Sequence, residues 1–112
     1  MARVIIADTV AAGNATAATI FTMPSGYSGF IGNLLATNTT GGALNLTLYV
    51  TRNGADNVIL PATAINGSAV YHGKNATNPV CQLAMRAGDI LKAMGSGAGI
   101  NITISGLRFS IT

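Results

Sequence analysis

Side chains that could take part in catalysis are few and widely spaced in this chain. The acidic residues are Asp8, Asp56 and Asp89, there is no glutamate, and His72 and Cys81 are each single. General acid–base catalysis needs two titratable groups within one site, and no spacing in the sequence brings such a pair together. We therefore predict no catalytic residues and no enzymatic activity.

The same scarcity bears on metals and cofactors. One histidine and one cysteine do not make a zinc-binding cluster, and the glycine-rich run 95–99 lacks the lysine and the helix of a phosphate-binding loop. Asp56 and Asp89 each follow a turn, where we expect their carboxylates to cap the local backbone. Cys81 lies in an apolar run and is expected to be a buried thiol. The sequence predicts neither a metal site nor a bound cofactor.

Charge is unusually scarce over the whole chain of 112 residues. Only 8% of the residues are charged and 49% are hydrophobic, whereas a globular domain usually has a charged share of about 25%. The six basic residues are scattered singly, unlike the clusters that bind nucleic acid, so we expect no direct nucleic-acid binding. Because a surface poor in charge promotes association, we expect a homo-oligomer.

Apolar runs in the sequence are too short for a signal peptide or a membrane span. We therefore expect synthesis in the cytoplasm and no contact with a membrane.

The sequence predicts that the elements positioning any site are strands and turns. Apolar residues recur at every second place, no segment keeps a helical period, and turn residues separate the runs. Asn53-Gly54 predicts a tight type I′ hairpin turn. The fold class is all-β, a single β-sandwich or jelly roll of about eight or nine short antiparallel strands. The expected strands are 3–6, 16–21, 30–37, 44–51, 57–60, 69–72, 80–85, 90–93 and 100–111.

The chain contains an internal repeat. Residues 32–52 and 88–108 align without gaps and share six identical residues, among them Arg52 and Arg108. At four further positions leucine in the first copy corresponds to isoleucine in the second, namely Leu34 to Ile90, Leu44 to Ile100, Leu46 to Ile102 and Leu48 to Ile104. We predict two equivalent hairpins that face each other across the core.

The chain is expected to divide into two parts. Residues 1–14 form an N-terminal arm or a first strand, and residues 15–112 form the β-sandwich domain. An apolar arm can add a strand to the sheet edge of another chain. The candidate contact residues in this arm are Arg3, Val4, Ile5, Ile6 and Asp8.

Other candidate contact residues come from aromatic and polar positions in turns. The irregular segment 61–79 is expected to project as a loop that carries Tyr71, His72 and Lys74. Tyr27 and Tyr71, flanked by glycine and polar residues, are the rings we expect to be exposed, while aromatics within strands are expected in the core or in cross-strand packing. Exposed rings could bind a glycan, although the chain has no tryptophan.

A succession of turns and strands resembles the small virion proteins of tailed bacteriophages. In that group a Pro-Ala-Gly type of turn precedes a strand that ends in Asn-Thr, and an Ala-Gly-Asp turn precedes the last hairpin. The resemblance extends over residues 22–108. The residues that carry it are Pro24-Ser25-Gly26, Phe30–Gly41, Leu44–Thr51, Arg86–Ile90 and Ile100–Gly106.

This resemblance implies a β-sandwich with a structural role. Its members serve as capsid decoration, or cement, proteins, or as accessory parts of necks, tails and fibres. For this chain it implies a place on the capsid surface of the virion after synthesis in the host bacterial cytoplasm. The implied partners are the major capsid protein and other copies of itself, as a dimer or trimer. The alternative is a neck, tail or fibre protein, which could be a glycan-binding adhesin.

Overall fold

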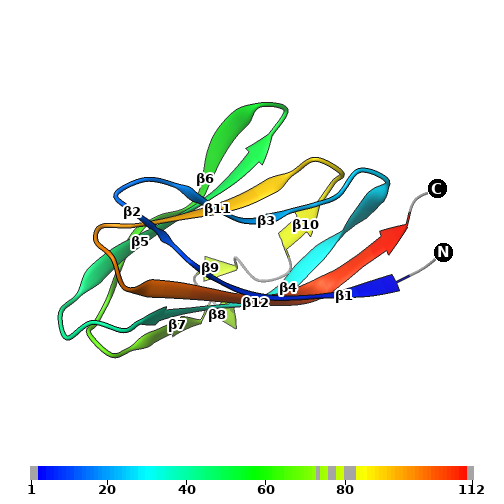
Figure 1. Ribbon diagram of the computed structural model, residues 1–112. Helices are drawn as coiled ribbons and strands as arrows, with labels where there is room; N and C mark the ends of the chain where they lie inside the picture. The colour runs from blue at the N-terminus through cyan, green and yellow to red at the C-terminus, as the bar shows by residue number, and fades with distance from the viewer. Residues whose placement is uncertain (1–2, 73, 76–77, 80–82, 111–112) are drawn as a thin grey trace.

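The structure, a computed structural model, describes residues 3–72, 74–75, 78–79 and 83–110; of residues 72, 74–75 and 78–79 it describes the backbone alone. Two sheets pack face to face as a β-sandwich of 46 × 24 × 23 Å, with both chain ends at one end of the long axis (Figure 1). The predicted all-β sandwich is confirmed. Cys81 lies outside the described residues.

Each sheet has five strands in the described part of the chain. In the first sheet the order is β1 (Arg3–Ala11), β12 (Ile100–Ser110), β4 (Tyr27–Asn38) and β10 (Leu83–Met85), and β7 (Val70–His72) also pairs with β4. In the second sheet it is β2 (Gly13–Asn14), β11 (Ile90–Gly95), β5 (Leu44–Arg52) and β6 (Ala55–Ile65), and β3 (Ala18–Thr22) also pairs with β11. A separate short ladder joins β8 (Lys74–Asn75) to β9 (Asn78–Pro79).

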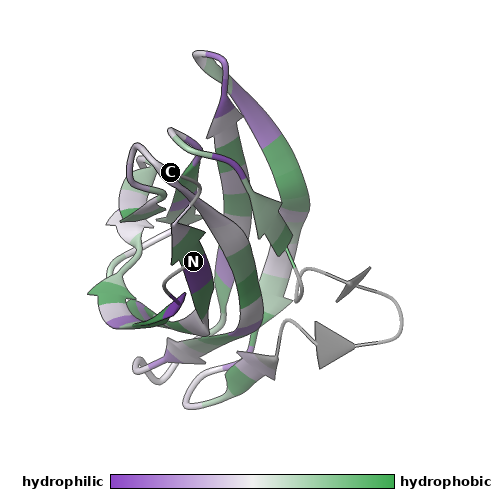
Figure 2. Ribbon diagram, turned by 90° about the vertical axis from the view of Figure 1, so that its right-hand side faces the viewer, coloured by the Kyte–Doolittle hydropathy of each residue, from purple (hydrophilic) through white to green (hydrophobic). Residues whose placement is uncertain are grey.

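Hydrophobic and hydrophilic residues alternate along the strands (Figure 2). The buried hydrophobic side chains of both sheets form one core cluster. In β12, Ile100, Ile102 and Ile104 are buried while the residues between them are exposed, as a strand with one solvent face requires. The same period buries Leu46, Leu48 and Val50 of β5 in the same hydrophobic cluster.

The repeated segment has a different architecture from the predicted one. The predicted pairing of its two strands into a hairpin is wrong, because β4 and β5 belong to different sheets, and so do β11 and β12. Each copy is an arch that crosses from one sheet to the other, and β4 pairs with β12 while β5 pairs with β11. The crossing loops hydrogen-bond to each other, with Thr39 N donating to Gly99 O at 2.8 Å and Ser96 N to Asn45 O at 2.9 Å.

The hairpin turn between β5 and β6 forms as predicted. Asn53 and Gly54 have φ values of 56° and 78°, and two positive φ values define a type I′ turn. The following strand is longer than predicted and continues through Pro61, which an edge strand tolerates.

A buried asparagine joins three segments at one end of the sandwich. The side chain of Asn38 is fully buried, and its Nδ2 donates to Gly42 O at 2.8 Å and to Ile65 O at 3.0 Å. Its Oδ1 accepts from Thr40 N at 2.9 Å and from Thr40 Oγ1 at 2.7 Å. The amide therefore connects the end of β4, the crossing loop and the end of β6.

Candidate functional site

The N-terminal candidate residues lie on β1, which pairs with β12 over nine residues. Successive side chains of β1 point to opposite faces of the first sheet, so Ile6 is 3% exposed whereas Ile5 is 76% exposed. Arg3, Val4 and Asp8 flank them on the same strand, and the Arg3 and Asp8 side chains are exposed. The structure thus divides this group between the core and the outer face.

A β-bulge in β4 decides which aromatic residue reaches the outer face. Asn33 lies opposite Ser105, and Ile31 lies opposite Gly106, so Gly32 is an extra residue on β4. Without this extra residue, the alternation that buries Leu34 would also turn Phe30 inward. With it, Ile31 is 1% exposed and Phe30 is 37% exposed. Phe30 packs near Phe109 on β12, with ring centroids 6.3 Å apart.

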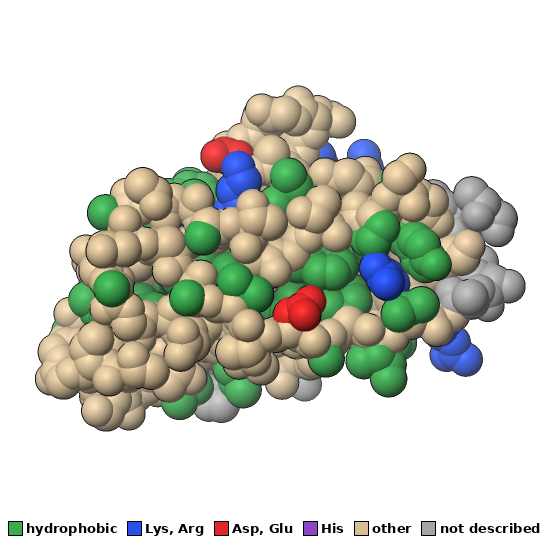
Figure 3. Space-filling view, viewed as in Figure 1, with side chains coloured by type: hydrophobic (Ala, Val, Ile, Leu, Met, Phe, Trp, Pro, Cys, Tyr) green, Lys and Arg blue, Asp and Glu red, His purple; other side chains and the backbone are tan. Residues whose placement is uncertain are grey.

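Apolar side chains then form a line across four of the five strands of the first sheet. Ile5 of β1 lies opposite Leu107 of β12, Leu107 lies opposite Phe30 of β4, and Phe30 lies opposite Ala84 of β10. We call these four residues the apolar row. Figure 3 shows hydrophobic side chains gathered at the end of the molecule that carries both termini, on a surface that otherwise shows little charge.

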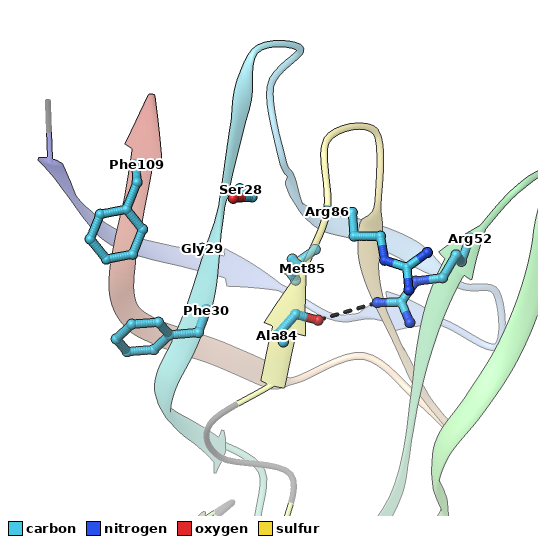
Figure 4. Close-up of a pocket in the computed structure, with 8 residues that line it drawn as sticks. All are labelled: Ser28, Gly29, Phe30, Arg52, Ala84, Met85, Arg86 and Phe109. Carbon is cyan, nitrogen blue, oxygen red and sulfur yellow. Dashed lines mark hydrogen bonds between the residues drawn. The ribbon is translucent and has the colours of Figure 1, made fainter. Parts of the chain in front are cut away.

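The apolar row leads into a groove of about 460 Å³ at the β10 side. Phe30 and Phe109 lie on one side of this groove and Arg52 and Arg86 on the other (Figure 4). An aromatic wall that faces two guanidinium groups combines the side-chain types that are enriched at protein–protein interfaces. The lining residues are Ser28, Gly29, Phe30, Arg52, Ala84, Met85, Arg86 and Phe109.

The groove is held in shape by an ion pair between the two copies of the repeated segment. Arg52 Nε and one terminal nitrogen donate to Asp89 Oδ2 at 2.9 and 2.7 Å, and the terminal nitrogen also donates to Ala84 O at 3.2 Å. Asp89 is 3% exposed, and its Oδ2 also accepts from Arg86 N at 2.8 Å. The predicted capping role of Asp89 is therefore confirmed, whereas its pairing with Arg52 was not predicted.

The pKa of Asp89 reflects this environment. Burial raises the pKa of the carboxyl, but the hydrogen bonds from Arg52 and the Arg86 backbone, together with the two arginine charges, outweigh burial and hold the pKa below its ordinary value of 3.8. A lowered pKa in the folded state stabilises the fold above the unfolded-state pKa. This contribution is lost as the pH falls through the folded-state pKa.

Asp89→Asn is expected to lower the free energy of unfolding at pH 7 by about 2 kcal/mol, because a charged, buried hydrogen-bond acceptor is removed. Below about pH 4 the wild-type protein should lose stability while the variant changes less, so the two curves should converge. Chemical denaturation between pH 2 and pH 7 measures both the difference in free energy of unfolding at pH 7 and the convergence of the two curves at low pH. Asp56→Asn is the control, since Asp56 is exposed and its pair with Lys92 spans 3.3 Å at the surface. Equal effects of the two substitutions would contradict the structural role of Asp89.

Asp56 does not cap the turn as predicted. Its carboxylate accepts hydrogen bonds from Thr51 Oγ1 and Lys92 Nζ, which lower its pKa. These partners lie across β5 and β11, so the carboxylate joins neighbouring strands of the second sheet.

The two tyrosines expected to be exposed are half-buried against the core. Tyr27 lies against Arg108, whose guanidinium carbon is 4.9 Å from the centre of the ring. Tyr71 belongs to β7 rather than to a projecting loop, its hydroxyl is buried, and burial raises its pKa. The side chains of His72 and Lys74 lie outside what the structure describes.

Among the residues that the structure describes, no group of three or more His, Cys, Asp or Glu side chains could hold a metal ion. Within the same part of the chain, no helix is long and apolar enough to cross a membrane.

Comparisons with known proteins give structural likenesses and no family. No protein-family model and no curated protein matches the chain. A solved structure described as "Bacillus endospore appendages form a novel family of disulfide-linked pili" aligns with 99% of this chain and 88% of its own, with 14% identity and a TM-score of 0.44. We carry nothing from that likeness to the function of this chain.

Proposed function

We propose that this chain is a structural virion protein of a tailed bacteriophage, a capsid decoration protein that binds the mature head through the apolar row and the adjoining groove. The observation that carries the proposal is the exposed apolar row beside two arginines. Ile5 and Phe30 are exposed large hydrophobic residues on β1 and β4, and β12 lies between these two strands. Contiguous exposed apolar surface on a small domain is typical of an interaction site.

The composition supports a role in permanent assembly. With 8% charged residues, the solvated surface relies on threonine, serine and asparagine, as in the Thr9–Thr103 hydroxyl pair at 3.2 Å on the outer face of the first sheet. Covering apolar groups and hydrogen-bonded hydroxyl groups costs less free energy of solvation than covering ionised groups. Arg86, exposed at the groove, favours an acidic group on the major capsid protein.

Stabilisation would follow from mass action. A protein that binds the mature shell and not its disassembled or immature forms shifts the equilibrium toward the mature shell. No chemical step is required of the bound chain. Because many copies bind to one shell, a modest stabilisation by each copy would add up to a large stabilisation of the mature shell.

Burial of the tyrosines supports the shell over a glycan as the binding partner. Tyr27 lies against Arg108 and Tyr71 is packed on the core, so neither presents an open ring face of the kind that stacks on a sugar. We therefore favour a protein surface on the head over a glycan bound by a tail or fibre adhesin.

Purified protein is expected to bind undecorated mature phage heads saturably, at defined icosahedral positions, and to raise their resistance to heat. Phe30→Asp should weaken this binding at least tenfold, because it places a carboxylate in the apolar row. Val58→Asp is the matched control: Val58 is 55% exposed and pairs with Tyr49 in the second sheet. Sedimentation of labelled protein with heads, followed by cryo-electron microscopy, measures occupancy and position.

Two results would count against the proposal. If the protein does not bind heads and is found on necks, tails or fibres of virions, decoration of the shell is wrong. If it binds heads equally well with Asp at position 30, the apolar row is not the contact surface.

A further inference from the structure

The free edges of the two sheets differ in how well they resist pairing with another strand. Proteins blunt exposed edges with short strands, bulges, proline or charge. On the far side of β4, the first sheet ends in β10 and β7, of three residues each. The second sheet ends on one side in the two-residue β2 and in β3, whose register shifts, and on the other in β6, which contains Pro61 and pairs irregularly.

The edge formed by β1 is nine residues long, and its charged residues are Arg3, at its first position, and Asp8. β1 pairs with β12 without a register shift, contains no proline and no lysine, and ends the first sheet (Figure 1). Its outward-facing residues between Arg3 and the end of the strand are Ile5, Ala7, Thr9 and Ala11, which are uncharged. Among the described edges, this one alone is long, regular and open.

Backbone geometry shows which N–H and C=O groups of β1 are available for pairing with another strand. Ala12 N donates to Ile100 O, and Thr39 N donates to Gly99 O on the other side of β12. Since hydrogen-bonding direction alternates along a regular strand, the even-numbered residues of β1 bond to β12. The odd-numbered residues, including Ile5, Ala7 and Thr9, therefore direct their N–H and C=O groups away from the sheet.

We propose that β1 pairs antiparallel with β1 of a second copy, about a two-fold axis at Ile5. Residues opposite each other in a continuous sheet share a face, so odd residues must lie opposite odd residues. In this register Ile5 lies beside the partner's Ile5, and Arg3 lies beside the partner's Ala7. The most exposed hydrophobic side chain is covered, and no like charges face each other.

A second copy fits this edge because the pairing is self-complementary. The symmetric contact occupies residues 3–7 of both edges at once. It also joins the apolar rows of two subunits into one line that runs from Phe30 through Leu107 and Ile5 into the partner. The inference deepens the proposed function, since a dimer would present a doubled apolar row to the shell.

Ala7→Pro tests the pairing in the intact protein. Proline removes the outward N–H of residue 7 and leaves the hydrogen bonds of β1 to β12 in place. By analytical ultracentrifugation the wild-type chain of 11.3 kDa should sediment as a dimer. Ala7→Pro should raise the dissociation constant at least tenfold, whereas Ala7→Ser, which keeps the N–H, should not change it. A monomeric wild type, or a dimer that survives Ala7→Pro in a folded variant, overturns the proposal.

A cross-link tests the register and does not depend on how well the proline variant folds. In a Cys81→Ser background, Ile5→Cys should form a disulfide-linked dimer on mild oxidation, because opposite residues lie about 5.5 Å apart. Thr9→Cys is the control, since the two copies of residue 9 would lie eight residues apart along the strand, about 27 Å. Equal cross-linking of both variants, or none of Ile5→Cys, overturns the register.

Head binding separates this inference from the proposed function. A wild-type monomer that binds heads overturns the β1 pairing and leaves the decoration role intact. A dimer that pairs through β1 and does not bind heads overturns the decoration role and leaves the pairing intact.

Discussion

Asn38→Ala is expected to lower the free energy of unfolding by about 3 kcal/mol, out of the roughly 5–15 kcal/mol that stabilises a typical domain. The substitution removes the donor to Ile65 O, leaves Gly42 O with Thr40 Oγ1 as its donor, and removes the acceptor of Thr40 N. Because Asn38 is fully buried, water cannot replace these bonds without opening the end of the sandwich. Urea denaturation at pH 7 measures the loss.

Asn33→Ala is the matched control for this substitution. Asn33 lies on the same strand, five residues earlier, with an exposed side chain on the outer face of the first sheet. Its replacement should change the free energy of unfolding by less than about 0.5 kcal/mol. If the two variants are equally stable, the amide of Asn38 does not hold β4, the crossing loop and β6 together.

Gly106→Ala is expected to destabilise the protein by about 3 kcal/mol or more, enough to reduce the yield of folded protein. A Cβ at residue 106 would lie 2.1 Å from Phe30 O and 2.9 Å from Ile31 Cα. Both neighbours are backbone atoms at the bulge of β4, so no side-chain rotation can relieve the overlap. The strands β4 and β12 would have to separate where they carry Phe30 and Leu107.

Gly41→Ala separates this overlap from the general effect of replacing glycine. No atom lies within 4 Å of a Cβ built at residue 41. The melting temperature of the Gly41→Ala variant should therefore equal that of the wild-type protein within a few degrees. Thermal unfolding followed by circular dichroism compares the two variants. A wild-type melting temperature for Gly106→Ala would show that β4 and β12 do not approach as closely as the structure has them.

Several features of the fold follow from local sequence. The alternation Ile100, Ile102 and Ile104 predicts a strand with one buried face, and the structure buries all three. Asn53-Gly54 predicts a type I′ turn, since these residues tolerate the two positive φ values that the turn requires. Such features depend on contacts within a few residues, so a single chain segment is enough to predict them.

The candidate docking surface was predicted in part. Ile5 was a candidate from the apolar character of the N-terminal segment, and it is exposed. Phe30 was expected in the core or in cross-strand packing, and it lies at the surface beside Phe109 because the bulge at Gly32 reverses its direction. A glycine in a strand is a signal for a bulge, although it does not say to which face the next residues turn.

The contacts that hold the groove open join residues far apart in the chain. Arg52 and Asp89 occur in different copies of the repeated segment, and no spacing rule pairs them.

Asn38 looks like an ordinary strand-end residue until the carbonyls of Gly42 and Ile65 are placed beside it.

The sequence by itself therefore determined the strands, the tight hairpin turn and the low charge of the surface, because these depend on local periodicity, turn chemistry and composition. Only the tertiary structure decided that each repeated segment crosses between the sheets, that the apolar row reaches the surface, and that β1 forms an open edge. Strand order and the direction of a side chain after a bulge depend on which distant strands pair. That choice is set by the free energy of the whole packed core, which no local pattern records.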